Sequence, residues 1–249
     1  MIVLKLGGSL ITEKDRPETL DGDALERAAE AIAETGGGTD LVVVHGGGSF
    51  GHHHAERHGV SPASGTDDAA AVAEIHGTMT TLNRFVLEAL LDRDVPAVPV
   101  QPLSMTRRDE NGALHVEASA VATLVREGFV PVLHGDVIAT ARAGVTVCSG
   151  DALVVTLARA LEADRVGLCA TVPGVLDEAG AVVDRIDSLE TVEALLGPTD
   201  GTDVTGGMRG KVERLLESET PGSVFGLDAL PAFLAGEVVG TTVAAEPSR

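Results

Sequence analysis

The sequence predicts an α/β protein with a mainly parallel sheet that helices cover on both faces. Short runs of branched apolar residues alternate along the chain with amphipathic helical segments, a pattern typical of parallel strands buried on both faces. Glycine-rich turns follow several of these runs, at the carboxyl ends of the predicted strands. Ligands of open parallel sheets bind beyond those ends, so the turns also mark the expected site.

The first half of the chain contains both kinds of element. Residues 2–6 form an apolar strand pattern, and residues 67–93 place apolar side chains near the 3.6-residue helical period. In chain order, the predicted elements are a strand at 2–6, a helix at 21–34 ended by glycines 36–38, a strand at 41–44, a helix beginning near Ser49, the helix at 67–93, a strand at 96–100 and a hairpin tip at 107–112.

The second half repeats this alternation. Its predicted elements are a helix at 118–127, a strand at 129–133, a hairpin with strands at 137–139 and 145–148, a helix from the Ser149 cap to residue 162, a strand at 165–169, a glycine turn at 203–211 that runs into a helix, and a final β-α-β unit at 223–225, 228–235 and 238–243. No linker or internal repeat interrupts the pattern, so we expect residues 1–249 to form a single domain.

Charge and composition exclude several classes of protein. The net charge is −20, with 38 acidic residues against 18 basic ones, which argues against nucleic acid and anionic membranes as partners. No apolar run reaches the roughly 18 residues of a membrane span. The chain opens on a strand and not on a signal peptide, and Cys148 and Cys169 lack zinc or redox spacing, so we expect a cytoplasmic protein. The acidic residues are dispersed, which favours adaptation to high salt, a hypothesis that a rise in melting temperature with KCl would support.

Lysine is rare in this chain. Of the 18 basic residues only Lys5, Lys14 and Lys211 are lysines. Because the other basic positions are arginines, the three lysines are expected to have a role that arginine cannot fill. A lysine is a compact charge on a flexible stem and can follow a moving phosphoryl group. Two of the three lie beside glycine turns, so the sequence favours a phosphoryl-transfer site.

The stretch from Leu41 to His54 carries the strongest single motif, an apolar strand followed by three glycines and a helix start. Such a turn binds anions, because backbone N–H groups and the helix dipole point at the same place. It partly matches other motifs. A dinucleotide fingerprint would need an acid at the end of the next strand, whereas Asp67 and Asp68 open a helix, and a Walker loop would need Lys where His52 stands. A hydrolase nucleophile elbow centred on Ser49 also fits the local spacing.

Four motifs in one order resemble the amino acid kinase superfamily along almost the whole chain. They are Lys5-x-Gly-Gly-Ser, His45-Gly-Gly-Gly, Ser149-Gly-Asp151 and Thr205-Gly-Gly-Met-x-x-Lys211. Within the superfamily, residues 48–52 and 203–208 resemble the archaeal isopentenyl phosphate kinases. The resemblance implies an open αβα sandwich, a homodimer, and phosphorylation of isopentenyl phosphate to isopentenyl diphosphate with ATP and Mg²⁺. It also implies an acceptor-binding lobe at 1–148 and a nucleotide-binding lobe at 149–249.

The resemblance assigns roles to the charged residues of these motifs. Lys5 and Lys211 would bind the nucleotide phosphates, and Lys14 would stabilise the transferring group. Asp151 would order Lys5 and Lys211 without touching substrate, although an acid at this spacing from Ser149 is also a helix-capping signal. The other nucleotide-binding positions implied are Gly7, Gly8, Ser9, Gly48, Thr171, Gly206 and Gly207.

On the acceptor side, the resemblance implies that His52 holds the acceptor phosphate. Gly47, Gly48 and Gly150 would line the space between donor and acceptor. Ile75 and Met79 fit the core side of a helix, and as an alternative they form the wall of an isoprenyl pocket. No side-chain metal ligand is expected, and His53, His54 and His58 are interpreted as exposed helix residues and not as a zinc site. His134-Gly-Asp136 is open between turn chemistry and function.

Two rival functions remain open at this point. A kinase for another small phosphorylated or phosphonate acceptor would use the same site, and acceptor chain length is not predicted. An α/β-hydrolase with Ser49 as nucleophile would leave the three lysines without a role. In addition, Thr171-Val-Pro173-Gly174 is one residue shorter than the Thr-Asp-Val-x-Gly of many relatives, near the expected nucleotide base, so the base preference is not predicted either.

Overall fold

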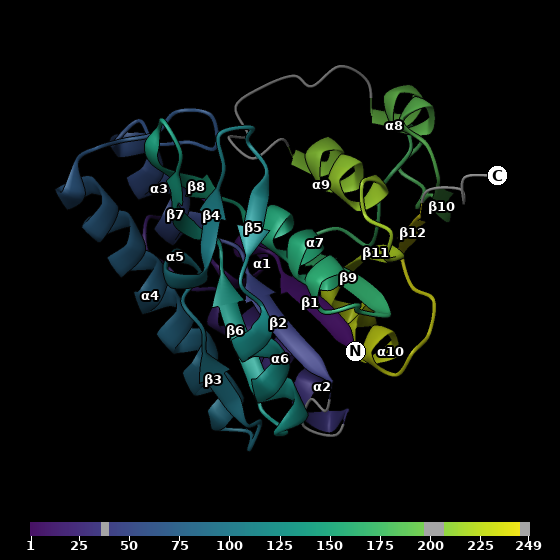
Figure 1. Cartoon of the computed structure of the whole chain (residues 1–249). Coiled ribbons are helices and arrows are strands. Elements are labelled where there is room, and N and C mark those ends of the chain that lie inside the picture. The colour runs from purple at the N-terminus through teal and green to yellow at the C-terminus, as the bar shows by residue number, and fades with distance from the viewer. Residues whose placement is uncertain (36–39, 197–206, 245–249) are drawn as a thin grey trace.

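A central sheet organises the chain (Figure 1). The computed structural model describes residues 1–35, 40–196 and 207–244. Within them an eight-stranded sheet has the order β10-β12-β11-β9-β1-β2-β6-β3, and neighbouring strands are parallel except β11 and β12. The strands are β1 (Ile2–Leu6), β2 (Leu41–His45), β3 (Ala97–Pro99), β6 (Val130–His134), β9 (Arg165–Ala170), β10 (Arg185–Ile186), β11 (Gly222–Gly226) and β12 (Thr241–Val243). The predicted mainly parallel sheet is confirmed.

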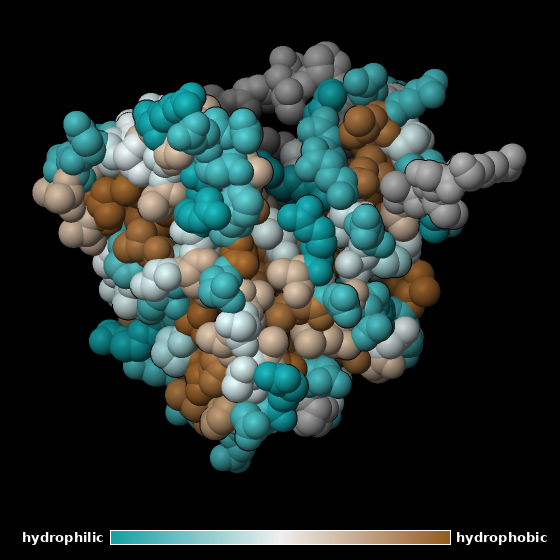
Figure 2. Space-filling model, viewed as in Figure 1, coloured by the Kyte–Doolittle hydropathy of each residue, from teal (hydrophilic) through white to brown (hydrophobic). Residues whose placement is uncertain are grey.

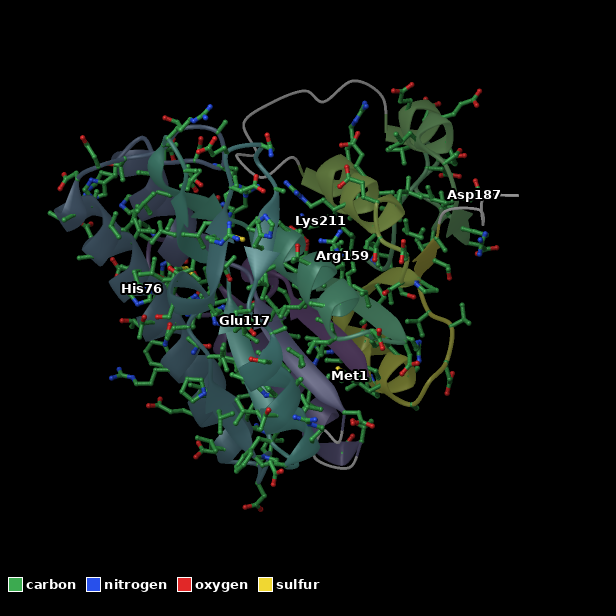
Figure 3. The ribbon with its side chains drawn as sticks, in the orientation of Figure 1. Met1, His76, Glu117, Arg159, Asp187 and Lys211 are labelled. Atoms are coloured by element: carbon green, nitrogen blue, oxygen red, sulfur yellow. The ribbon has the colours of Figure 1, made fainter. Side chains whose placement is uncertain are left out.

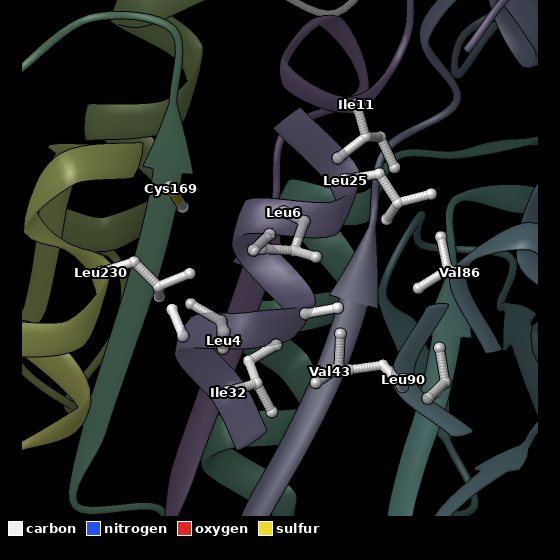
Figure 4. Packing of buried hydrophobic residues seen from close by; sticks show 14 of the residues in the cluster. Leu4, Leu6, Ile11, Leu25, Ile32, Val43, Val86, Leu90, Cys169 and Leu230 are labelled. Atoms are coloured by element: carbon white, nitrogen blue, oxygen red, sulfur yellow. The ribbon is translucent and has the colours of Figure 1, made fainter. Parts of the chain in front are cut away.

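Helices cover both faces of this sheet, because successive side chains of its buried strands point to opposite sides. Leu4, Leu6 and Val43 pack against one helical layer, shown in Figure 4, and Val3 and Val42 pack against the other. The first layer contains α2 (Gly22–Glu34), α4 (Ala69–Leu91) and α10 (Leu230–Leu234), and the second contains α6 (Ser119–Arg126), α7 (Gly150–Ala160) and α9 (Gly207–Leu216). The predicted open αβα sandwich is therefore confirmed.

A second, four-stranded sheet lies beside α3 (Gly48–Arg57) and α4 (Figure 1). Its order is β5-β4-β7-β8 within the described residues. The strands are β4 (Thr106–Arg108), β5 (Leu114–Val116), β7 (Asp136–Thr140) and β8 (Gly144–Cys148). Both predicted hairpins are present, but their union through the parallel pair β4–β7 was not predicted, because nothing in either hairpin specifies its neighbour. Val137 of this sheet packs with Ala55 and Ile75.

The predicted boundaries hold to within a few residues for most elements, including the short strand β3 and the two hairpins. The final unit differs from the prediction, since the strand expected at 238–243 is only β12 and pairs antiparallel with β11. Elements not predicted are α1 (Gly8–Ile11), α5 (Pro102–Met105), β10 and α8 (Leu189–Leu196), and the helix predicted at 228–235 is divided into the 3₁₀ turn η1 (Leu227–Ala229) and α10. Most are too short to show a period. Glycines 36–38 and the turn at 203–206 lie outside the described residues.

One sheet runs through both predicted lobes, since β1 pairs with β2 on one side and with β9 on the other. The division into an acceptor lobe at 1–148 and a nucleotide lobe at 149–249 stays a prediction.

The surface is rich in acidic side chains. Asp23, Glu26 and Glu30 occupy the exposed side of α2, opposite the buried Leu25 and Ile32. Figure 2 shows hydrophilic residues spread over the visible face, with apolar residues in separate patches. Among the described residues, no helix combines the length and the apolar character that crossing a membrane requires.

The glycine turns after β1 and β2 touch backbone to backbone. A Cβ on Gly8 would lie 2.2 Å from the amide nitrogen of Gly48, and a Cβ on Gly46 would lie 2.5 Å from the amide nitrogen of Gly8. Gly48 also has φ of +48°, a conformation that side chains disfavour. The two strand ends can lie this close only because these positions carry no side chain.

We predict opposite effects for two glycine-to-alanine changes. Gly8→Ala should lower the free energy of unfolding by about 1–3 kcal/mol, because its methyl group would collide with backbone that cannot move aside. Gly77→Ala, in the exposed interior of α4 with nothing within 4 Å of the new Cβ, should raise it by about 0.5–1 kcal/mol. Urea unfolding of both variants measures the two changes. Equal effects would contradict the close contact.

Candidate active site

A cavity of about 580 Å³ opens beyond the carboxyl ends of β1, β2, β6 and β9. Every predicted site residue that the structure describes borders it. These residues are Lys5, Gly7, Gly8, Ser9, Lys14, Gly47, Gly48, His52, Ile75, Met79, Gly150, Asp151, Thr171, Gly207 and Lys211. The remaining one, Gly206, lies outside the described residues. Segments far apart in sequence therefore meet at one place, although the role of each residue stays a prediction.

A buried ion pair forms the floor of this cavity. Lys5 on β1 donates from Nζ to Oδ1 of Asp151 at 2.7 Å, and the two side chains are only 6% and 7% exposed. Burial pushes the pKa of Asp151 upward, but the charges of Lys5 and Lys211 outweigh it and hold that pKa below the usual range. A Cβ on Gly150 would lie 3.1 Å from Cε of Lys5, so glycine leaves room for the pair.

The helix cap beside this pair belongs to another residue. Ser149 Oγ accepts the N–H of Ala152 at 3.2 Å and begins α7. The carboxylate of Asp151 instead faces the lysines. Of the two roles predicted for the Ser149–Asp151 motif, Ser149 therefore caps the helix and Asp151 contacts Lys5.

Besides the single turn α1, three longer helices of the described chain begin at the cavity, and their first residues line it. They are α3 at Gly48, α7 at Gly150 and α9 at Gly207. Unpaired N–H groups and the helix dipole make each such end partly positive. Lys14, exposed on the loop before α2, and Lys211 on α9 add full charges. Figure 3 shows Lys211 on α9. The cavity is thus built to bind anions.

One part of the cavity lining combines an imidazole with an apolar wall. His52 is exposed and is the fifth residue of α3. Ile75 and Met79 of α4 are each 2% exposed, and both pack into the core while bordering the cavity, so the two interpretations of these residues are compatible. Val60 and Val147 extend the apolar wall.

The interpretation of His54 as an exposed residue was wrong. His54 is buried, with Nε2 at 2.8 Å from Glu18 and Nδ1 at 2.6 Å from Glu74. Its position on α3 turns the ring toward α4, where a carboxylate makes burial of the polar ring possible. His53 is exposed as expected, and the half-buried His58 also contacts Glu74.

The geometry of Ser49 does not fit a hydrolase. Its Oγ donates to the carbonyl of Thr19 at 3.2 Å and accepts the N–H of Thr19 at 3.3 Å. A serine nucleophile needs a hydrogen-bonded base, whereas here the hydroxyl holds a backbone segment. Ser49 connects α3 to the loop that carries Lys14.

Asp136 is a cavity residue to which the sequence assigned no firm role. It is buried, accepts the N–H of Val137 at 2.8 Å and lies 2.9 Å from Nδ1 of His76. The hydrogen bond with Asp136 raises the pKa of His76, and partial burial opposes this. Figure 3 shows His76 on α4. His45 and His134 lie side by side at the ends of β2 and β6, and each is followed by glycine. This repeated His-Gly pair at a strand end was the sequence signal that could have placed Asp136 at the site.

The ion pair predicts a pH-dependent stability difference. A carboxyl group whose pKa is lowered on folding stabilises the folded state above its unfolded pKa, and this contribution is lost as the pH falls toward the folded pKa. Asp151→Asn should therefore cost on the order of 3 kcal/mol at pH 7, because it removes the carboxylate charge that pairs with buried Lys5 at 2.7 Å. The difference from wild type should shrink below about pH 4, the ordinary aspartate pKa. Urea unfolding of both proteins at pH 7 and pH 3 measures it, and a gap independent of pH would contradict the pairing.

Comparison with known proteins agrees with this geometry. The model of the amino acid kinase family matches residues 1–220. Isopentenyl phosphate kinase of Haloferax volcanii is 54% identical over 246 residues, which cover 99% of each chain. The enzyme of the same name from Methanothermobacter thermautotrophicus is 36% identical over 264 residues, which cover 98% of each. A solved isopentenyl phosphate kinase structure superposes with a TM-score of 0.84 at 31% identity, covering 98% of this chain and 100% of the other. The chain therefore belongs to the amino acid kinase family and, within it, to the isopentenyl phosphate kinases.

Proposed function

We propose that the chain transfers the terminal phosphoryl group of ATP to isopentenyl phosphate, which forms isopentenyl diphosphate and ADP. The observation that carries this proposal is that the chain's three lysines, Lys5, Lys14 and Lys211, border one cavity lined by glycine turns. The full-length relatives named isopentenyl phosphate kinase support the choice of acceptor.

The donor phosphates fit the glycine-lined part of the cavity. Lys5 and Lys211 neutralise their charge, and Asp151 keeps both lysines in place. The backbone N–H groups that surround the phosphates belong to residues without bulky side chains, and a Cβ at several of these positions would meet neighbouring backbone. The residues proposed for this role are Gly7, Gly8, Ser9, Gly48, Thr171, Gly206 and Gly207.

When bound, Mg²⁺ would supply charge neutralisation for the donor phosphates. In the described part of the chain, no three His, Cys, Asp or Glu side chains are grouped so that they could hold a metal ion. The two buried carboxylates at the cavity already have partners, Lys5 for Asp151 and His76 for Asp136. We therefore propose that ATP and water provide most of the metal ligands, as is common for Mg²⁺.

The acceptor phosphate would lie between Gly47, Gly150 and His52, with Lys14 beside the transferring group. One of its oxygens attacks the terminal phosphorus of ATP, and the bond from that phosphorus to the bridging oxygen breaks. A phosphate monoester is already anionic near neutral pH, so the site needs no general base. Alignment and charge neutralisation then provide most of the catalysis.

The apolar wall favours an acceptor with a hydrocarbon tail over the rival small phosphorylated or phosphonate acceptors. Ile75 and Met79 would contact that tail, and each methylene they bury contributes about 0.8 kcal/mol. The homodimer, the cytoplasmic location and the adaptation to high salt stay predictions.

The direct test measures ADP release with ATP and a panel of acceptors. Isopentenyl phosphate should support the fastest release, and a phosphonate, a short alkyl phosphate and N-acetylglutamate should support much less. Equal release with N-acetylglutamate, the acceptor named in more distant relatives, would overturn the proposal.

Loss of either flexible lysine should slow turnover strongly. Lys14→Ala and Lys211→Ala should each reduce kcat on the order of 10²–10³-fold, the usual cost of one transition-state charge contact. Arginine at these positions should restore little, because its planar group cannot follow the same path. Steady-state kinetics of the four variants measures this, and wild-type turnover in an alanine variant would refute the role of that lysine.

His52 should be specific to the acceptor. His52→Ala should lose most of its turnover with isopentenyl phosphate while ATP binding, measured by calorimetry, stays nearly unchanged, because the ring is proposed to donate to the acceptor phosphate. His52→Gln, which can still donate one hydrogen bond, should retain more activity than His52→Ala. Turnover at the wild-type rate in His52→Ala would remove this residue from the acceptor site.

A further inference from the structure

The loop that carries Lys14 leaves the fold at Thr12 and returns at Leu20, where the two residues form an isolated antiparallel bridge. Inside it, Glu13 donates its N–H to the carbonyl of Thr19 at 2.9 Å, and Arg16 contacts Glu13 through its backbone N–H at 3.3 Å and its side chain at 2.9 Å. Lys14 is exposed at the cavity. These contacts join residues of the loop to one another, so the place of Lys14 in the cavity also depends on contacts between the loop and neighbouring elements.

Helix α3 holds this loop at two points. At its start, Ser49 bonds the backbone of Thr19 through Oγ, accepts the N–H of Glu18 with its carbonyl at 3.3 Å, and donates its own N–H to Thr12 at 3.0 Å. One and a half turns further on, His54 contacts the Glu18 side chain at 2.8 Å. The second point lies outside the cavity, since neither His54 nor Glu18 borders it.

Both ring nitrogens of His54 face carboxylates. Nε2 lies 2.8 Å from Glu18 and Nδ1 lies 2.6 Å from Glu74 of α4, while the side chain is only 8% exposed. A neutral imidazole has one N–H and can donate to one of them, whereas the doubly protonated ring donates to both. The largely buried ring thus lies between two carboxylates and forms a direct contact between α4, α3 and the loop.

Glu74 is the fixed end of this link. It also contacts Arg57, the last residue of α3, at 2.8 Å and His58, the C-cap of that helix, at 3.0 Å. Hydrogen bonds from His58 and then His54 lower the pKa of Glu74 and keep it ionised. At the other end, Glu18 has φ of 49°, an uncommon backbone conformation for a residue other than glycine, which contacts around this residue must stabilise.

We propose that His54 is a positioning residue that ties the Lys14 loop to α3 and α4 through Glu18 and so sets where Lys14 meets the transferring phosphoryl group. The inference rests on the proposed function, in which Lys14 acts on that group. Helix α3 then has two tasks, since His52 faces the cavity while His54, two residues on, faces the loop and α4.

The kinetic test compares His54→Ala and Glu18→Gln with Arg57→Ala. His54→Ala should lower kcat by about 10–100-fold with little change in the KM for ATP, because a misplacement of about 1 Å can cost that much. Glu18→Gln, which removes the charge but keeps an acceptor oxygen, should show a smaller loss in the same direction. Arg57→Ala is the matched control, because Arg57 contacts Glu74 without touching the loop, and its kcat should be unchanged. Wild-type kcat in both His54→Ala and Glu18→Gln would overturn the proposal.

A test in a protein that already carries Lys14→Ala separates a positioning role of His54 from a general effect on stability. If His54 acts through Lys14, His54→Ala should cause almost no further loss in a protein that already carries Lys14→Ala. An equal further loss there would show a purely structural role and overturn the proposal. Should His54→Ala fail to fold, Glu18→Gln in the same two backgrounds decides, since the Glu18 side chain is half exposed and its loss leaves the core intact.

A measurement without substrates keeps this proposal separate from the proposed function. Hydrogen exchange of the amides at 13–19 should become faster in His54→Ala and Glu18→Gln but not in Arg57→Ala. Unchanged exchange in the first two variants would overturn the link. Absence of isopentenyl phosphate-dependent ADP release in the wild-type protein would overturn the proposed function alone.

Discussion

The buried pair of Lys5 and Asp151 is the contact on which the site depends. Two charges taken out of water cost several kcal/mol each unless they meet at short distance, as these do at 2.7 Å. Lys5 lies on β1, between the two halves of the large sheet, and Asp151 lies in the first turn of α7. The pair therefore fixes the start of α7 against the centre of the sheet. Gly150 allows this approach because it has no side chain.

A protein with net charge −20 nevertheless has a cavity suited to two polyanions. Near the cavity, each buried or half-buried carboxylate described above has a cationic or hydrogen-bonding partner. Asp151 has Lys5, Asp136 has His76, and Glu74 has a cluster of basic side chains from α3. Two exposed carboxylates, Asp15 and Glu56, also border the cavity, whereas those further away are screened by water and salt beyond about 10 Å. Local pairing of the buried acids thus leaves the lysines and helix ends able to attract anions to the site.

The fold could be predicted from the sequence because the central strands are buried on both faces and must be apolar throughout, as Leu41 to Val44 are. The lysines could be identified because the chain has only three. The burial of His54 could not be predicted, because helical spacing indicates the direction of a side chain but not which carboxylate it contacts. Its partners Glu18 and Glu74 are 36 and 20 residues away in sequence. The same limit applies to Asp136 and His76, which are 60 residues apart.

The place of β1 in the sheet has a consequence for how the chain folds. This strand is near the N-terminal end, yet it pairs with β9, where Ile2 lies opposite Arg165. At ordinary rates of synthesis, β1 must wait roughly 10–30 s on the ribosome before that partner exists. During this time one edge of an apolar strand lacks its neighbour, and contacts so distant in sequence also close slowly. Folding of the nascent chain should therefore be completed late, and the unpaired edge of β1 is the part that a chaperone would have to shield from other chains.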